Sequence, residues 1–500
     1  MKSNDVLNMI ESRAAELRRA ILERADRHSF SGTVYYVSAS GDDANDGKTP
    51  ENAWKSLACV SNASLLPGDA VLFCRGDVFR GQLKAQKGVF YGAYGTGEKP
   101  RLYAWEENLA DPSLWECVDE DSHIWKYNRE ILDVGTLVFD EGAAHSYKLI
   151  PSYIQGRFVC RDDENRLFEM KNEMERDLDI YWYYEKTFCT IPSKGESFPI
   201  PVVSDNTYGT LYLRCDKGNP GAVYSSIEAL AGRNLIVVGG TADVTIENLC
   251  LKYVGRHAIG AGGFCVKNLS VRGCEIGWIG GGIQHYSGTD PNYPEGRRGT
   301  VTRFGNGVEV YGGCENYEVS DCYIYEVYDA GITHQVTTGG NKFEMKNVLY
   351  RDNLIENCVY AIEYFLDMTE GDCESYMENV EICGNILRTS GYGWGQQRHN
   401  KHTPALIKGW SYVNAAKENY TVHHNIFDRC AYRMLHLVAK ERKSCPEMYE
   451  NIYLQHVGGM LGQYGGQEQG EPKILTFDEN VECVIREVLG DRDATVGILE

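Results

Sequence analysis

Three carboxylic acids stand in similar short segments of the chain, and their type and spacing suit acid–base chemistry. Glu309 lies in GNGVEVYGG, Asp329 in YDAGITHQ and Glu363 in YAIEYFLD. Each acid lies within or beside a run in which apolar and polar residues alternate, as in a half-buried β-strand. Carboxyl groups that share one exposed face can protonate a leaving group and activate a nucleophile. We therefore expect Asp329, Glu363 and Glu309 to be catalytic residues that cleave a glycosidic bond.

The elements that would position these acids are short strands that recur along the second half of the chain. Similar phrases begin at Asp243, Asn268, Asn316 and Asn347, with looser copies from Asn379 and Asn419. The step from Ile259 to Ile283 spans 24 residues, and so does the step from Val308 to Ile332. A repeat of this length, with no amphipathic helix between the strands, predicts an all-β chain that forms a parallel β-solenoid.

Strand alternation predicts which side chains leave the interior of the stack. If the Ile of each Gly/Ala-Ile step points inward, the next residue points outward, and the outward ladder contains Gln284, Glu309, Thr333 and Glu363. Neighbouring coils lie about 4.8 Å apart, so Glu309 and Glu363 would be about 10 Å apart with Thr333 between them. Two plainer interpretations remain open: each outward Glu belongs to a solvated face, or Asp329 caps the turn before Gly331.

Residues around this ladder could bind a sugar. The long loop between Ile283 and Val308 would form one wall and the segment GYGWGQQRHNKH the opposite wall, since aromatic rings pack on sugar faces and amides bind hydroxyls. The expected substrate-binding residues are His334, Gln335, Gln284, Tyr286, Arg303, Tyr364, Asp367, Trp394, Gln397 and His399. Two alternatives stay open: GYGWGQQRHNKH is an ordinary Gly-rich turn, and His334, which alternates inward, is a buried histidine.

The pattern divides the chain into five parts. Residues 1–30 form an amphipathic helix, and residues 31–106 form the first coils. Residues 107–225 break the rhythm and are expected to be an inserted β-rich subdomain, after which 226–440 form the main coils with the active face. Residues 441–500 supply closing strands and the tail. The helix and the tail would cap the open ends of the stack, because uncovered strand edges invite pairing with other chains.

Composition limits the partners. The net charge of −21 disfavours nucleic acid and anionic lipid, and no segment has the length of a membrane span. The 17 cysteines fall mostly in apolar strand positions, which favours packed thiols in a reducing compartment. We find no signal peptide in the first residues, so a cytoplasmic location is expected. His399 and His402, and likewise His423 and His424, lack a third ligand at metal-site spacing, so no metal or cofactor is expected.

The opening of the chain resembles a known group of proteins. The phrases YYVSASGDD, DGKTPENAWKSL, PGDAVLFCRGDVFRG and YGAYGTGEKP are similar to the start of right-handed parallel β-helix enzymes that act on carbohydrates, which share the pectate-lyase-like fold. The three carboxylate segments also resemble those of β-helix glycoside hydrolases. The resemblance implies a right-handed β-helix, with Asp329 and Glu363 as the acid/base and nucleophile (or base) pair and Glu309 as a third candidate.

Three functions are compatible with these observations. The first is a glycoside hydrolase that acts on short oligosaccharides or glycosides. The second is a lyase or epimerase of uronate-containing glycans, for which the repeat face offers no ladder of Lys or Arg but could offer acidic ligands for Ca²⁺. The third is a solenoid that binds glycans without catalysis, because a fold alone proves no chemistry. The sequence does not indicate an oligomeric state.

Overall fold

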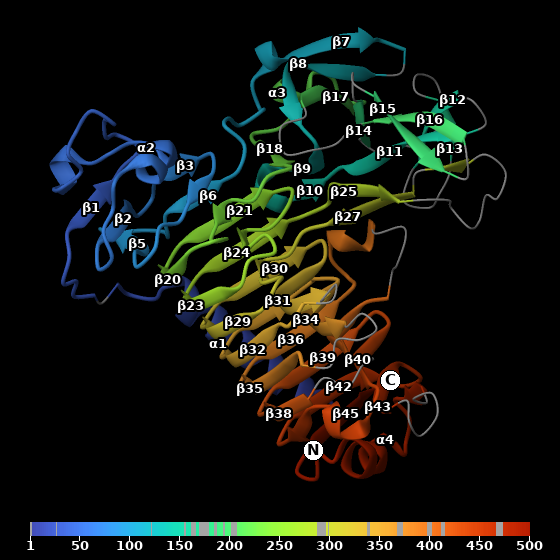
Figure 1. Cartoon of the computed structure of the whole chain (residues 1–500). Helices are drawn as coiled ribbons and strands as arrows, with labels where there is room; N and C mark the ends of the chain where they lie inside the picture. Colours follow the sequence, from blue (N-terminus) through green and yellow to red (C-terminus); the bar gives the residue numbers. More distant parts are fainter. Residues whose placement is uncertain are drawn as a thin grey trace.

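The chain is predominantly β, with three long parallel sheets that we name A, B and C (Figure 1). The computed structural model describes residues 3–500 except 27, 122, 155–156, 162–166, 170–179, 185–187, 194–195, 202–207, 288–296, 299, 338–340, 368–373, 398–402, 412–415 and 467–473. The strands of sheet A, in spatial order, are β1 (Val34–Val37), β2 (Ala70–Cys74), β5 (Phe90–Tyr94), β20 (Ala242–Glu247), β23 (Val266–Arg272), β29 (Cys314–Ser320), β32 (Glu344–Arg351), β35 (Tyr376–Cys383), β38 (Ala416–His423) and β41 (Glu447–Tyr449).

Sheets B and C run beside sheet A, and successive coils contribute strands to them in the same spatial order. Sheet B consists of β10 (Ala144–His145), β9 (Val134–Phe139), β18 (Ile227–Ala231), β21 (Cys250–Val254), β24 (Glu275–Ile279), β30 (Tyr323–Val327), β33 (Leu354–Glu356), β36 (Ile386–Ser390), β39 (Ile426–Cys430), β42 (Ile452–His456) and β45 (Thr495–Leu499), with β3 (Val78–Arg80) and β6 (Arg101–Tyr103) joined to β21. Sheet C consists of β4 (Leu83–Lys84), β19 (Ile236–Val237), β22 (Ile259–Gly260), β28 (Val308–Glu309), β31 (Ala330–Thr337), β34 (Tyr360–Asp367), β37 (Ala405–Ser411), β40 (Arg433–Ala439), β43 (Met460–Gly466) and β44 (Ile474–Thr476).

The chain passes through the three sheets in turn, once per coil. For example, β29, β30 and β31 belong to sheets A, B and C, and the next coil repeats this order with β32, β33 and β34. Inward side chains of the three sheets meet in one apolar cluster, which includes Val271, Ile276 and Ile332 with no exposed surface. The predicted alternation and the parallel pairing are both present.

Asparagines at one corner explain why each repeated phrase begins with Asn or Asp. Asn268, Asn316 and Asn347 have φ angles of 52°, 55° and 54°, a left-handed conformation that Asn and Asp adopt more readily than other non-Gly residues. Their amides also form a ladder along the stack: Asn316 Nδ2 donates to Asn268 Oδ1 at 2.7 Å, and Asn347 Nδ2 donates to Asn316 Oδ1 at 2.8 Å. The repeat therefore records a turn that only certain residues favour.

The N-terminal helix α1 (Ser3–Leu22) is present, but it lies along sheet B and does not cap an end of the stack. Its apolar face packs on residues of successive sheet B strands, namely Leu354, Ile386, Ile426, Leu454 and Leu499. This corrects the predicted cap: a stripe of apolar residues repeated on successive coils offers the helix a continuous surface. Among the helices that the structure describes, none is long and apolar enough to cross a membrane.

Other short helices supply apolar residues near the two ends of the stack. Near β1, helix α2 (Leu57–Asn62) contributes Leu57 and Val60 to the main core (Figure 1). In the tail, α4 (Val481–Val484) and the following π-helix η7 (Ile485–Leu489) contribute Val481 and Ile485 to the same core. The remaining short helices are η1 (Pro50–Asn52), η2 (Pro112–Leu114), η3 (Asp140–Gly142), α3 (Pro220–Val223), η4 (Trp394–Gln397) and η5 (Arg442–Ser444).

A largely antiparallel subdomain interrupts one strand position of sheet B. Its strands are β7 (Trp115–Asp119), β8 (Ile124–Leu132), β11 (Tyr147–Ile154), β12 (Arg157–Arg161), β13 (Leu167–Glu169), β14 (Ile180–Tyr184), β15 (Phe188–Ser193), β16 (Glu196–Pro201) and β17 (Tyr208–Arg214). The chain leaves the parallel coils after β6 and resumes them at β18, and both of these strands pair with β21; in between, β9 and β10 extend sheet B as antiparallel strands. The two segments thus complete one strand position together, from either side of the insertion.

A hairpin interrupts the coil between β24 and β28. It consists of β25 (Gly282–Ser287) and β27 (Thr300–Phe304), which pair antiparallel, and the short strand β26 (Arg297–Arg298) within it pairs with β11. Ile259 therefore has Val308 as its partner in sheet C, and Ile283 pairs with Arg303 in the hairpin. This corrects the predicted step from Ile259 to Ile283: the equal spacing there does not mark one coil.

Cysteines in the repeats pack as apolar side chains. Cys250, Cys274, Cys322 and Cys358 are free thiols and are buried. Cys274 and Cys322 belong to the main core. This agrees with the expectation that these residues act as small apolar groups.

Candidate active site on sheet C

Sheet C presents a row of polar side chains that point away from the main core. We name it the carboxylate lane, and it consists of Glu309, Thr333, Glu363, Lys408, His436 and Gln463. Strand pairing places Thr333 opposite Glu363, and Glu309 follows Val308, the partner of Ile332. Because adjacent strands lie about 4.8 Å apart, the backbones at Glu309 and Glu363 are about 10 Å apart. The predicted order Glu309, Thr333, Glu363 is present in the strand register.

Glu309 is held by a histidine of the preceding coil. His257 Nε2 contacts Glu309 Oε2, and both side chains are largely buried. The backbone N–H of Asn306 donates to His257 Nδ1 at 3.0 Å, so the ring proton must reside on Nε2, where it faces the carboxylate. This contact fixes the orientation of the Glu309 carboxylate.

Glu363 is held by a lysine of the following coil. Lys408 Nζ lies 2.7 Å from Glu363 Oε1, and Glu363 is 6% exposed. The same ammonium lies 4.1 Å from the ring centre of Tyr360 and 4.9 Å from that of Trp410. These contacts fix the position of the Glu363 carboxylate and of the Lys408 ammonium beside it.

His436 continues the lane as a neutral group. Burial, with the positive charges of Arg433 and Lys408, lowers the pKa of His436 to about 4. Its Nδ1 faces Gln463 Oε1 at 3.1 Å. Near neutral pH the ring is therefore uncharged and can donate or accept a hydrogen bond without competing with Lys408 for Glu363.

A second outward row, one step further along the same strands, is mostly aromatic. We name it the aromatic lane, and it consists of Tyr311, Gln335, Phe365 and Trp410. The rings of Phe365 and Trp410 are stacked with centres 4.4 Å apart, and Tyr311 meets Phe365 edge-on at 6.2 Å. Within the described part of the chain, the buried Gln335 Oε1 has no hydrogen-bond partner. Next to the carboxylates there is thus a row of aromatic rings that includes the buried amide of Gln335.

Asp329 lies at the entrance to β31 and outside the lane itself. Its backbone N–H donates to Gly305 O at 3.2 Å, and its carbonyl accepts from Tyr360 N at 2.9 Å. It precedes Thr333 by four positions and is 7% exposed. Asp329 is therefore one coil and four positions away from Glu363, and not directly opposite it.

Two residues predicted to touch substrate lie in the interior. His334 has no exposed surface, its Nδ1 is 2.9 Å from the Tyr350 hydroxyl, and its Nε2 is 3.2 Å from that of Tyr420. Tyr364 stacks on the His334 ring at 5.3 Å. The prediction for His334 and Tyr364 is corrected, because strict alternation turns both inward when Thr333 and Glu363 point outward.

Three further predicted contacts join segments of the protein to one another. Arg303 is fully buried and donates to the carbonyls of Gly281 and Gly135, at 2.8 and 3.0 Å. Trp394 is 1% exposed and packs on Tyr328 with ring centres 5.1 Å apart. Gln397 Nε2 donates to Ser146 O at 2.9 Å. These positions replace the predicted sugar contacts of Arg303, Trp394 and Gln397 with packing roles, which no local spacing could reveal.

The other predicted binding residues are placed only in part. Gln284 is exposed on the β25–β27 hairpin and is not in the carboxylate lane, which corrects its place in the predicted ladder. Tyr286 belongs to β25, and Asp367 is the last residue of β34, opposite Thr337. His399 lies outside the described residues.

The site contains several residues that were not among those predicted, namely Lys408, Trp410, Phe365 and His257. Lys408 and Trp410 lie in ALIKGW, where the residue after the Ile of ALI points outward by the same rule that gave Glu363. Phe365 follows from the same alternation in YAIEYFLD. The signal was therefore present for these three. No such signal indicated His257, because its contact with Glu309 depends on the hairpin that separates the two residues in the chain.

Glu326 gives this region a pH-dependent contribution to stability. Glu326 Oε2 accepts a hydrogen bond from the backbone N–H of Trp394 at 2.8 Å, and burial raises the pKa of Glu326 to about 7. In the unfolded chain the pKa of Glu326 is near 4.5, so the folded state binds this proton more tightly. The resulting stabilisation is fully present below pH 4.5 and is lost as the pH rises through about 7. In the wild type, the free energy of unfolding should therefore fall by about 1–3 kcal/mol between pH 5 and pH 8 because of this group. We expect Glu326→Gln to abolish that fall. Urea unfolding at both pH values measures this change, with Glu418→Gln, a substitution of an exposed acid, as the control. The same change in unfolding free energy with pH in the wild type, Glu326→Gln and Glu418→Gln would contradict the prediction.

Comparisons with known proteins give distant likenesses. No protein-family model matches the chain. A match over 99 residues is 51% identical to a lacto-N-biosidase of Bifidobacterium longum subsp. longum, but covers 17% of this chain and 6% of that protein. The structure of XylC with xylose is 12% identical, with a TM-score of 0.41, and the match covers 93% of this chain and 82% of that one. The GH136 lacto-N-biosidase from Eubacterium ramulus is 14% identical, with a TM-score of 0.30 over 85% of this chain and 64% of that one. These likenesses are too distant to assign an activity to this chain.

Proposed function

We propose that the chain is a glycoside hydrolase, built on a right-handed β-helix, that binds its sugar over the carboxylate and aromatic lanes of sheet C. The observation that carries the proposal is the strand register, which sets Glu309 and Glu363 on either side of Thr333 beside the Phe365–Trp410 stack. A pyranose can rest its apolar face on such a stack.

The contacts of each acid support distinct roles in the reaction. Glu363, positioned by its ion pair with Lys408, is assigned the role of general base that activates the attacking water. Asp329 is suited to protonate the leaving oxygen. Glu309 is bonded to His257 and is suited to orient the substrate as a carboxylate. In the reaction, water attacks the anomeric carbon and gives a proton to Glu363, while the glycosidic C–O bond breaks and its oxygen takes a proton from Asp329.

The register favours inversion of the anomeric centre. Retaining enzymes need carboxyl groups about 5–5.5 Å apart, whereas inverting enzymes leave room for a water at about 6.5–9.5 Å. Asp329 and Glu363 lie on neighbouring coils but are offset by four positions along the strands. Four strand positions span about 13 Å, which is too wide for a retaining pair, and both side chains must lean toward the substrate to reach the inverting range. We further propose short oligosaccharides or glycosides as substrates and a cytoplasmic location, in keeping with the cysteine-rich composition.

A screen of aryl glycosides and short oligosaccharides tests the proposed class. We expect release of the aglycone or of reducing sugar, without dependence on added metal, and NMR of the first product should show the inverted anomer. A first product with the substrate's own configuration would contradict the inverting assignment. No cleavage of any member, together with measurable sugar binding, would favour a solenoid that only binds glycans.

A uronate lyase is the second candidate, favoured by one observation. Lys408 places a positive charge in the carboxylate lane, beside Glu363. The ammonium group of Lys408 could pair with the carboxylate of a uronate substrate. Polyuronate cleavage that yields a product absorbing in the ultraviolet and that stops with EDTA would select this function over hydrolysis.

A further inference from the structure

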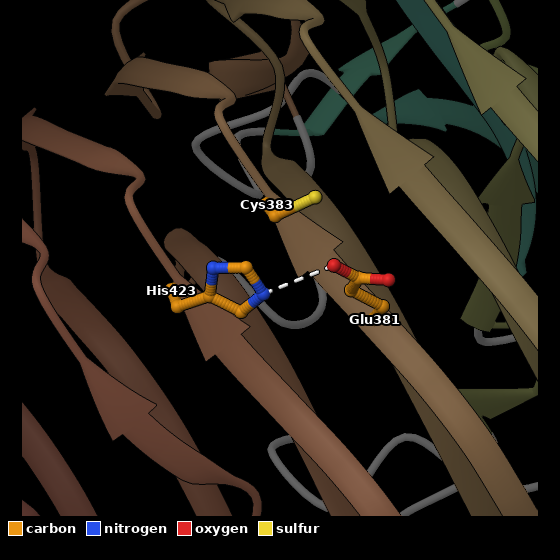
Figure 2. A group of neighbouring side chains, drawn as sticks. All are labelled: Glu381, Cys383 and His423. Carbon is orange, nitrogen blue, oxygen red and sulfur yellow. Dashed lines mark hydrogen bonds and ion pairs between the residues drawn. The ribbon is translucent and has the colours of Figure 1, made fainter.

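A group of three potential metal ligands lies on the outer face of sheet A, away from the carboxylate lane. Glu381 and Cys383 point outward from β35, and His423, opposite Cys383 in the register, comes from β38 (Figure 2). One ligand atom of each residue lies within 4.8 Å of those of the other two. His423 Nε2 is 3.1 Å from Glu381 Oε1. Thiol, imidazole and carboxylate thus converge at one point.

The histidine is oriented by a chain of further contacts. Its ring lies parallel to that of Tyr449 on the next coil, with centres 4.4 Å apart and planes 6° apart. His423 Nδ1 lies 2.8 Å from His424 Nδ1, and His424 Nε2 lies 2.9 Å from Glu450 Oε2. With Nε2 bound to a cation, His423 would donate its Nδ1 proton to His424, whose own Nε2 proton would face Glu450. This arrangement matches the outer partners that fix metal-binding histidines.

We propose that Glu381, Cys383 and His423 form a binding site for one zinc ion. Sulfur and imidazole nitrogen select a borderline-soft metal such as Zn²⁺ and disfavour Ca²⁺ or Mg²⁺, which require several oxygen ligands. Three protein ligands leave the fourth tetrahedral position for water or a small ligand. Glu381 is exposed and Cys383 is half-buried, so solvent has access to that position.

Sequence spacing could not reveal the site. His423 lies 40 positions after Cys383 in the chain, but the parallel register brings them side by side. The adjacent pair His423 and His424 lacks a third ligand only in the linear sequence. Zinc would join the strands of two neighbouring coils, and it should therefore raise the melting temperature, because a ligand bound only by the folded state stabilises it.

Metal titration of the full-length, tag-free protein, first stripped of metal, tests the proposal. We expect calorimetry to show one Zn²⁺ bound per chain. Co²⁺ should give the near-ultraviolet absorption of a cobalt–thiolate bond. Cys383→Ser and His423→Gln should abolish the thiolate band and weaken zinc binding. The control is Cys265→Ser, the same change at an exposed cysteine outside the site, which should leave both the band and zinc binding unchanged. His424→Phe should weaken binding about 10- to 100-fold by removing the outer partner.

Folding of each variant is checked by circular dichroism and by its melting temperature without metal. Zinc binding that persists in both Cys383→Ser and His423→Gln, or cobalt binding without a thiolate band, would overturn the site. So would the absence of binding in the wild type. None of these results depends on the proposed glycosidase activity, which resides on sheet C.

Discussion

Glu363→Gln is expected to lower kcat by about three orders of magnitude or more on any glycoside that the wild type cleaves. This corresponds to a rise in the activation barrier of about 4 kcal/mol. The amide keeps the shape of the side chain and can still accept a hydrogen bond from Lys408, but it cannot take a proton from water. The loss should therefore appear in kcat, with a small change in KM. Steady-state kinetics with Glu418→Gln, an exposed acid on sheet A, provides the control.

The three acids should respond differently to the leaving group. Asp329→Asn is expected to lose activity severely on glycosides of poor leaving groups and far less on activated aryl glycosides, which need no proton. Glu363→Gln should lose activity on both. Glu309→Gln should raise KM more than it lowers kcat, since its carboxylate is assigned an orienting role. A Glu363→Gln variant with wild-type kcat would remove the carboxylate lane from the chemistry, and a reversed leaving-group pattern would exchange the roles of Asp329 and Glu363.

Asp133→Asn is expected to destabilise the fold by about 3–5 kcal/mol. Asp133 and Lys148 form an ion pair at which the side chains are 3% and 0% exposed. Asp133 Oδ2 also accepts the backbone N–H of Ile283 at 2.6 Å. The pair thus links the inserted subdomain to the β25–β27 hairpin, and the amide removes the charge that compensates the buried ammonium. Denaturant unfolding measures the change.

The double variant Asp133→Leu with Lys148→Met separates charge burial from general disruption. Replacing a buried ion pair by apolar groups of similar volume is often close to neutral, whereas removal of one partner is costly. The double variant should therefore be more stable than Asp133→Asn, apart from the cost of the lost bond to Ile283. If the double variant proves the less stable of the two, the ion pair itself contributes the stability.

Much of the stack could be predicted because its signals are local. Alternation predicted the direction of Thr333 and Glu363, and the Asn at each phrase start reflects a left-handed backbone conformation that this residue type favours. The same alternation also placed His334 inward, although its chemistry suggested a ligand contact. The equal spacing of Ile259 and Ile283 is misleading because the β25–β27 hairpin begins at Gly282, and the sheet C strand of the next coil follows only at Val308.

The walls of the site could not be predicted because they depend on contacts between remote segments. Arg303 donates to the carbonyl of Gly135, and Gln397 to that of Ser146, across the junction with the inserted subdomain. No periodicity links such positions. The polar and aromatic character of the loops suggested a binding surface, but the same side chains satisfy buried partners.

The strand position shared by β6 and β18 sets an order for folding during synthesis. Residues 104–226 must leave the ribosome before β18 can complete the position that β6 begins. The strands of the first coils therefore have no following coil to pair with while residues 104–226 are translated. Strand β20 then pairs with β5, and β21 with β6. We expect the nascent chain to acquire protease resistance late, once the segment beyond Val254 has emerged, and from there to lengthen coil by coil.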